Sequence, residues 1–85
     1  MDLEAFKIKK NKLMAWGEQY KLDYTGSDPK VGRVSFADYS LGIKLDIYTS
    51  KNTVCIMRER QQPVYKKKQS MEMIEQIMEA PYELI

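Results

Sequence analysis

Hydrophobic and polar positions follow two different periods along this chain. Between Asp2 and Tyr20, apolar side chains recur at near-helical spacing with lysines between them, which predicts a helix. Apolar and polar residues then alternate over 33–37 and 41–48, and a period of two is typical of strands with one buried face. The apolar positions are Leu3, Phe6, Leu13, Met14 and Tyr20 in the helix, and Val34, Phe36, Leu41, Ile43, Leu45 and Ile47 in the strands.

A turn at Ser50 and Lys51 would join the second of these strands to a third. With that turn, Ile47 faces Val54 and Leu45 faces Ile56, so that apolar residues meet on one face of the sheet. The same register pairs mixed residues on the other face: Tyr48 with Thr53, Asp46 with Cys55 and Lys44 with Met57. The hydrophobic pattern and the turn therefore predict the same hairpin.

The end of the chain predicts a second helix. Ser70 is a suitable N-cap, Glu72 suits the positive end of the helix dipole, and Pro81 stops the helix. Its buried stripe comprises Met71, Ile74, Ile77 and Met78. Residues 23–29 are rich in turn formers and predict a loop, with 21–24 as a candidate for an additional short strand. Residues 58–68 contain Pro63 and little periodicity, so we interpret them as a basic connection.

These elements predict an α+β fold of the order α-β-β-β-α, an antiparallel three-stranded meander packed against two helices. The 85 residues are too few for more than one domain, so we assign 1–85 to a single hydrophobic core. A core of this size gives modest stability, and an exposed edge strand can pair with another chain. A homodimer is therefore one possible assembly.

The inventory of reactive side chains argues against an enzyme. The chain has no histidine, and its single cysteine, Cys55, falls in mid-strand without a partner that would activate it. Asp23 and Asp28 lack the spacing of a calcium loop, and four isolated glycines form no phosphate loop. We expect no metal and no cofactor. A lone thiol, a charged start and the absence of a long apolar run predict a cytoplasmic protein without a membrane partner.

The distribution of charge is more informative than the net charge of +2. Cations and one aromatic residue cluster before the last helix, a mixture that binds phosphates while a ring stacks on a base. The candidate residues there are Arg58, Arg60, Tyr65, Lys66, Lys67 and Lys68. The mixed sheet face, with Lys44, Tyr48 and Met57 and with Arg33 and Tyr39 as further members, is a second candidate platform. The simpler alternatives are a solvated connection and an ordinary exposed strand.

Two resemblances add to this interpretation. The order α-β-β-β-α, with Lys66, Lys67 and Lys68 opening the last helix, is similar to the double-stranded-RNA-binding domain, in which lysines at that place contact phosphates. The last helix departs from that family because it is acidic, carrying Glu72, Glu75 and Glu79. Residues 45–81 also resemble short uncharacterised proteins of bacteria and their phages, which implies an accessory role.

Two functions follow as hypotheses. The first is a small non-enzymatic module that binds nucleic acid through the basic segment and the adjacent sheet edge. The alternative is a phage-encoded inhibitor that binds a host defence or regulatory protein. The small size of the chain and its acidic last helix are compatible with such an inhibitor. The net charge is compatible with both partners, nucleic acid or a host protein.

Overall fold

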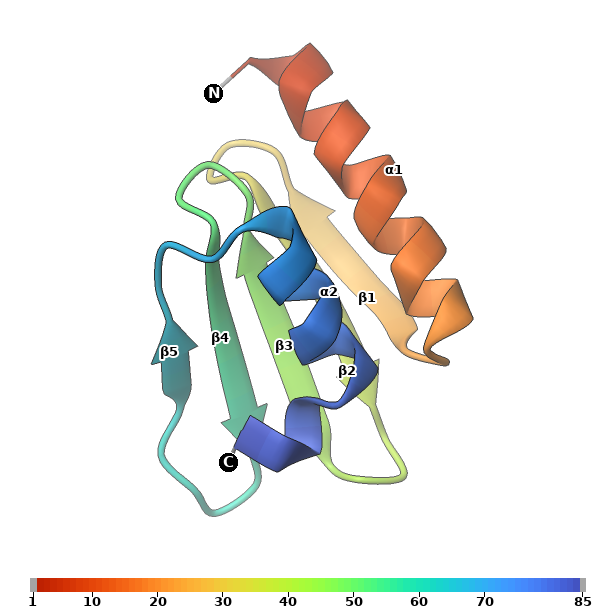
Figure 1. Ribbon diagram of the computed structural model, residues 1–85, viewed down its shortest axis with the longest axis vertical. Helices are drawn as coiled ribbons and strands as arrows, with labels where there is room; N and C mark the ends of the chain where they lie inside the picture. Colours follow the sequence, from red (N-terminus) through yellow and green to blue (C-terminus); the bar gives the residue numbers. More distant parts are fainter. Residues whose placement is uncertain (1, 85) are drawn as a thin grey trace.

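The computed structural model describes residues 2–84 as two α-helices, a five-stranded sheet and a final 3-10 turn (Figure 1). In chain order these are α1 (Leu3–Gln19), β1 (Asp23–Asp28), β2 (Arg33–Asp38), β3 (Ile43–Tyr48), β4 (Thr53–Arg58), β5 (Val64–Lys66), α2 (Met71–Glu79) and η1 (Pro81–Leu84). The predicted α+β class, with an antiparallel meander packed against two helices, is confirmed.

The sheet is a simple meander in the order β1-β2-β3-β4-β5, with every neighbouring pair antiparallel. Between β3 and β4 the register pairs Ile47 with Val54 and Leu45 with Ile56. This register is the one that the apolar pattern predicts, because any shift by one residue would turn the apolar side chains towards water. The strands therefore present one continuous apolar face.

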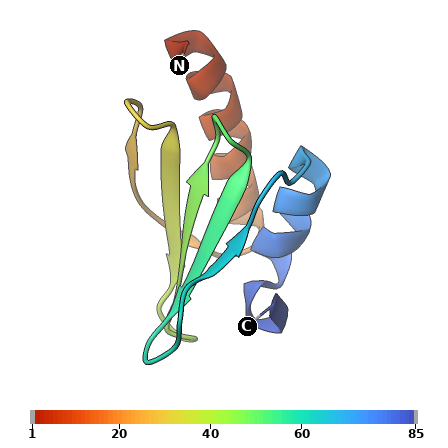
Figure 2. The same ribbon diagram turned by 90° about the vertical axis from the view of Figure 1, so that its left-hand side faces the viewer.

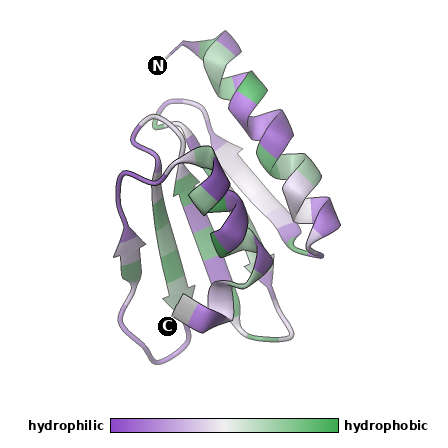
Figure 3. Ribbon diagram, viewed as in Figure 1, coloured by the Kyte–Doolittle hydropathy of each residue, from purple (hydrophilic) through white to green (hydrophobic). Residues whose placement is uncertain are grey.

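Both helices lie on that apolar face, and the opposite face carries no helix (Figures 1 and 2). The buried stripe of α1 is narrow, because only Phe6, Leu13 and Gly17 are buried along its seventeen residues. Helix α2 lies across the middle of the sheet, with its polar side outward (Figures 1 and 3). The core shared by the two layers contains Phe6, Leu13, Leu22, Val34, Phe36, Ile43, Leu45, Ile47, Val54, Ile56, Ile74, Ile77 and Met78.

The number of strands is five, so the prediction of three was too low. The predicted loop at 23–29 is mostly strand β1, which pairs with β2 and contains a register shift between Tyr24 and Gly26. As an edge strand, β1 needs partners on one side only, so it tolerates turn-forming residues and a bulge. Gly26, at a φ of 148°, adopts a backbone conformation that other residues avoid.

The predicted basic connection at 58–68 contains the other additional strand. Residues Val64–Lys66 form β5, which pairs with β4 through Cys55 opposite Tyr65. Three residues are too short for a visible period of two, which explains why the pattern did not predict this strand. Pro63 directly precedes β5. Proline has no N–H to donate to a neighbouring strand, and this loss is tolerated at the beginning of an edge strand.

The boundaries of both helices agree with the sequence. Asp2 caps α1 by accepting a hydrogen bond from the Glu4 N–H at 3.1 Å. Ser70 caps α2, as predicted, because its Oγ accepts from the Met73 N–H at 3.2 Å. The predicted stripe of α2 is also confirmed: Ile74, Ile77 and Met78 are buried, and Met71 packs against them.

One end of the sheet is held together by hydrogen bonds between four segments, and we call it the loop end. The Thr49 N–H and Oγ1–H both donate to the Gly32 carbonyl, which joins the β3–β4 turn to the β1–β2 turn. Lys9 of α1 donates from Nζ to the Thr49 carbonyl at 2.9 Å. The Gln69 N–H donates to the Asn52 carbonyl at 2.9 Å, which fixes the segment leading into α2 against the same turn.

Candidate nucleic-acid interface

The face of the sheet opposite the helices is the first candidate site, and we call it the open face. It is formed by the residues that alternate with the core positions of β2, β3, β4 and β5. These residues are Arg33, Ser35, Lys44, Asp46, Tyr48, Thr53, Cys55, Met57 and Tyr65. Most of them are partly or fully exposed, so the face is a mixed surface that a ligand can reach.

A row of polar groups crosses the centre of the open face. Register places Ser35, Asp46, Cys55 and Tyr65 side by side on four neighbouring strands. The Ser35 hydroxyl donates to Asp46 Oδ1 at 2.6 Å, which fixes the carboxylate in place. Tyr65 is 59% exposed, so its ring is available at the edge of this row.

Two members of this row, Cys55 and Tyr65, have raised pKa values and remain protonated at neutral pH. Burial raises the pKa of the Cys55 thiol, and Asp46 adds to the effect. The hydrogen bond with Cys55 raises the pKa of Tyr65. A buried, protonated thiol is a poor nucleophile, and a neutral phenol is suited to stacking or hydrogen bonding.

The loop end of the open face carries a pocket of about 340 Å³, which we call the loop-end pocket. Its walls are Tyr48, Lys51, Thr53 and Lys67, from β3, the β3–β4 turn, β4 and the segment after β5. Arg33, on β2, is the cross-strand partner of Tyr48. The Arg33 Nε is buried and has no hydrogen-bond partner among residues 2–84.

The structure separates the basic residues that the sequence places together. Lys67 lies at the loop-end pocket and Tyr65 on the open face, while Lys66 points to the helical side. Lys68 is exposed, with a φ of 56° that turns the chain towards α2. Arg58 and Arg60 lie at the opposite end of β4, in a second pocket with Leu41, Gly42 and Glu59. The segment therefore does not form one basic surface.

The candidate residues on the sheet, by contrast, share the open face. Lys44 and Met57 are paired neighbours, and both line a pocket with Tyr39 near the β2–β3 loop. Tyr48 lies at the other end of the same strand. The sequence did not identify Lys51, Thr53 and Ser35 as site residues, although the predicted hairpin register already put Thr53 opposite Tyr48.

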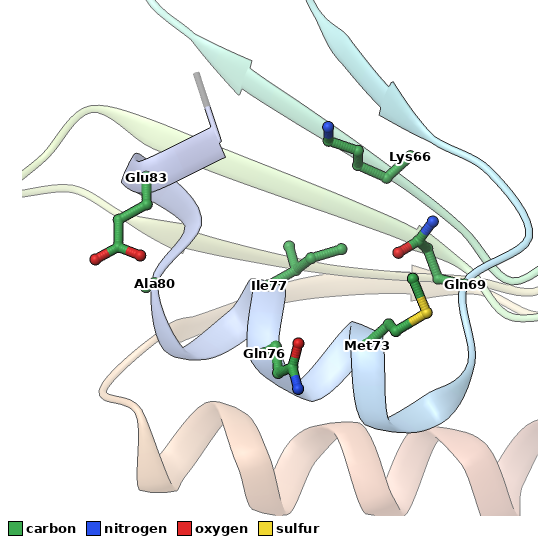
Figure 4. Close-up of a pocket in the computed structure, with 7 residues that line it drawn as sticks. All are labelled: Lys66, Gln69, Met73, Gln76, Ile77, Ala80 and Glu83. Carbon is green, nitrogen blue, oxygen red and sulfur yellow. The ribbon is translucent and has the colours of Figure 1, made fainter.

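A second hollow lies on the helical side, between β5 and α2 (Figure 4). This groove of about 420 Å³ is lined by Lys66, Gln69, Met73, Gln76, Ile77, Ala80 and Glu83. Met73 and Ile77 form its apolar floor, and Met73 is 44% exposed. Lys66 and Glu83 place opposite charges at different parts of its rim (Figure 4).

Two kinds of feature are not found in the part of the chain that the structure describes. Within residues 2–84, no group of three or more histidine, cysteine, aspartate or glutamate side chains is arranged to hold a metal ion. No described helix is long and apolar enough to cross a membrane.

Comparison of the chain with protein-family models, with curated proteins and with solved structures finds no match.

Proposed function

We propose that this protein binds single-stranded nucleic acid on the open face of its sheet. One observation carries the proposal: both helices pack on one face, which leaves the tyrosines Tyr48 and Tyr65 on the other, between cations at the two ends of the strands. Aromatic rings that stack on bases, flanked by cations that contact phosphates, are the usual elements of single-strand binding.

The arrangement of charge favours a bound strand that places its bases over the centre of the open face and its phosphates near the ends of the β-strands. Asp46 repels a phosphate from the centre of the face, but its carboxylate accepts a hydrogen bond from a base amino group, as acidic side chains do with cytosine. Cations of this face lie towards the two ends of the strands, with Lys51 and Lys67 at the loop end and Lys44 towards the other. Strand β4 separates these ends by about 17 Å, at a rise of about 3.3 Å per residue.

A single strand fits this surface better than a duplex. In a duplex the base faces are stacked inside and the phosphates meet the protein first. The open face offers two tyrosine rings, the half-buried Tyr48 and the exposed Tyr65, and it has the Asp46 carboxylate at its centre. None of these groups suits a phosphate backbone. We infer a binding role without catalysis, since the chain has no histidine and the Cys55 thiol is buried.

Matched tyrosine variants test the proposal. Fluorescence anisotropy with a labelled single-stranded DNA and a single-stranded RNA, at ~50 and ~200 mM salt, should show binding that weakens at the higher salt. Tyr65→Ala should weaken it by roughly fivefold to a hundredfold, the range expected for one lost base–aromatic stack. Tyr82→Ala is the control, because Tyr82 is similarly exposed, at 49%, but lies in η1 on the helical side. Equal effects of the two variants, or no binding by the unmodified protein, would contradict the proposal.

The groove between β5 and α2 favours a second candidate function, the binding of an extended peptide from another protein. The outer edge of β5 carries no strand in the described sheet, so a peptide can add there and place one apolar side chain over Met73 and Ile77. Lys66 forms no ion pair among the described residues and would suit an acidic neighbour in the peptide.

A displayed library of random peptides tests this second candidate. Selected peptides should share a bulky apolar residue next to an acidic one, and Met73→Lys should abolish their binding. Met57→Lys, on the open face, is the control and should leave peptide binding unchanged. Peptides that bind the Met73→Lys variant as well as the unmodified protein would rule out the groove.

A further inference from the structure

The loop-end pocket combines the groups that recognise a phosphate. Lys51 and Lys67 line it from two sides, and neither lysine forms an ion pair among the described residues. The Thr53 hydroxyl donates to the Lys51 carbonyl over 3.4 Å, a long hydrogen bond that a shorter one to a phosphate oxygen would replace. Tyr48 forms the remaining wall, so a ring can stack beside the anion.

Arg33 adds an unsatisfied donor to this end of the face. Its Nε is buried without a hydrogen-bond partner, and leaving a charged donor unpaired is costly unless a ligand supplies the acceptor. Asp28 pairs with Arg33 in the sheet, but its Oδ1 already accepts from the Lys30 N–H at 3.0 Å. The Asp28 carboxylate stays negative and offsets part of the Arg33 charge, so the cationic balance around the pocket comes from Lys51 and Lys67.

Hydrogen bonds also fix the segment after β5, which carries Lys67, at the loop end. The Gln69 N–H is bonded to the Asn52 carbonyl, and Gln69 Nε2 donates to the Lys67 carbonyl at 2.8 Å. These bonds hold the segment against the β3–β4 turn, so that Lys67 stays beside the pocket that Lys51 lines from the turn.

From these observations we propose that the loop-end pocket holds the terminal phosphate of a single-stranded nucleic acid, an inference that rests on the function proposed above. A terminal phosphomonoester carries a charge of about −1.5 to −2 near pH 7, whereas each phosphate within the strand carries −1. Lys51 and Lys67 bring two positive charges to match the larger charge. Thr53 donates the hydrogen bond that orients the phosphate, and Tyr48 contacts the last base.

Oligonucleotides of one sequence, phosphorylated at the 5′ end, at the 3′ end or at neither, provide the test. One of the phosphorylated forms should bind about tenfold more tightly than the unphosphorylated form, since hydrogen bonds to a charged group are worth about that factor. Thr53→Val, which keeps the shape of the side chain, should lower the affinity for the phosphorylated form to that for the unphosphorylated form. Ser27→Ala, on β1, is the control and should keep the preference.

The outcomes separate this inference from the proposed function. Equal affinity for all three oligonucleotides would overturn the terminal-phosphate site and leave single-strand binding intact. Binding of a nucleoside monophosphate as tight as that of the phosphorylated oligonucleotide would also overturn it, because the ligand would then be a free nucleotide. No binding of any oligonucleotide would overturn both.

Discussion

At the scale of single residues, Gly17 shows how closely α1 approaches the sheet. A Cβ built at this position would lie 2.6 Å from Cε1 of Phe36, nearer than real atoms approach. Phe36 is buried in the centre of the core and cannot move without disturbing its neighbours. The glycine therefore allows α1 to pack closely on the ring of Phe36.

Substitution of Gly17 by alanine should destabilise the protein despite the better helix propensity of alanine. Propensity favours alanine by about 1 kcal/mol, whereas overpacking a well-packed core costs about 1–3 kcal/mol. We expect a lower urea midpoint for Gly17→Ala. Glu18→Ala, at an exposed neighbouring position, is the matched control and should change the midpoint little. A Gly17→Ala protein more stable than the unmodified one would show that α1 does not pack this closely.

At the scale of elements, the two helices are joined by a hydrogen bond that the sequence did not predict. The Tyr20 hydroxyl, at the end of α1, donates to Glu75 Oε2 on α2 at 2.7 Å. The sequence showed only that the last helix is acidic, because a pattern within one helix contains no information on its neighbour. The bond raises the pKa of Tyr20 to about 12.

This raised pKa predicts a dependence of stability on alkaline pH. The folded protein holds the Tyr20 proton more tightly than the unfolded chain, whose tyrosine pKa is about 10. The stabilisation is complete below pH ~10 and is lost as the pH rises towards ~12. Urea denaturation should show that the unmodified protein exceeds Tyr20→Phe in stability at pH 8 and that the difference shrinks across this window. A constant difference would mean that the hydroxyl is not bonded to Glu75.

The sequence predicted the long elements well and the edge strands poorly. The helix caps and the β3–β4 register follow from local chemistry and from the apolar period, which both act over a few residues. Strands β1 and β5 form because a neighbouring strand supplies hydrogen bonds, so Gly26 and Pro63 did not exclude them. The separation of Lys66 from Lys67 follows from β5 as well, since adjacent strand residues point to opposite faces.

At the scale of the whole molecule, the division into a helical side and an open face is the basis of the proposed function. Thirteen buried residues tie both helices to one face of the sheet. Mixed polar and aromatic side chains remain on the other face, with a pocket at the loop end. The sequence predicted the mixed character of this face from the hairpin register. The bond between Gln69 and Asn52, which fixes the segment after β5 at the loop end, joins distant segments, and no local pattern contains such a contact.

A titration of the isotope-labelled protein with single-stranded DNA, followed by amide chemical shifts, tests the central claim most directly. We expect the largest changes at Ser35, Asp46, Tyr48 and Tyr65, on the strands of the open face, and at Lys67 beside them. The amides of Met73 and Gln76, on the outer side of α2, should change little. Shifts concentrated in α2 and the groove, with β3 and β4 unaffected, would contradict the account.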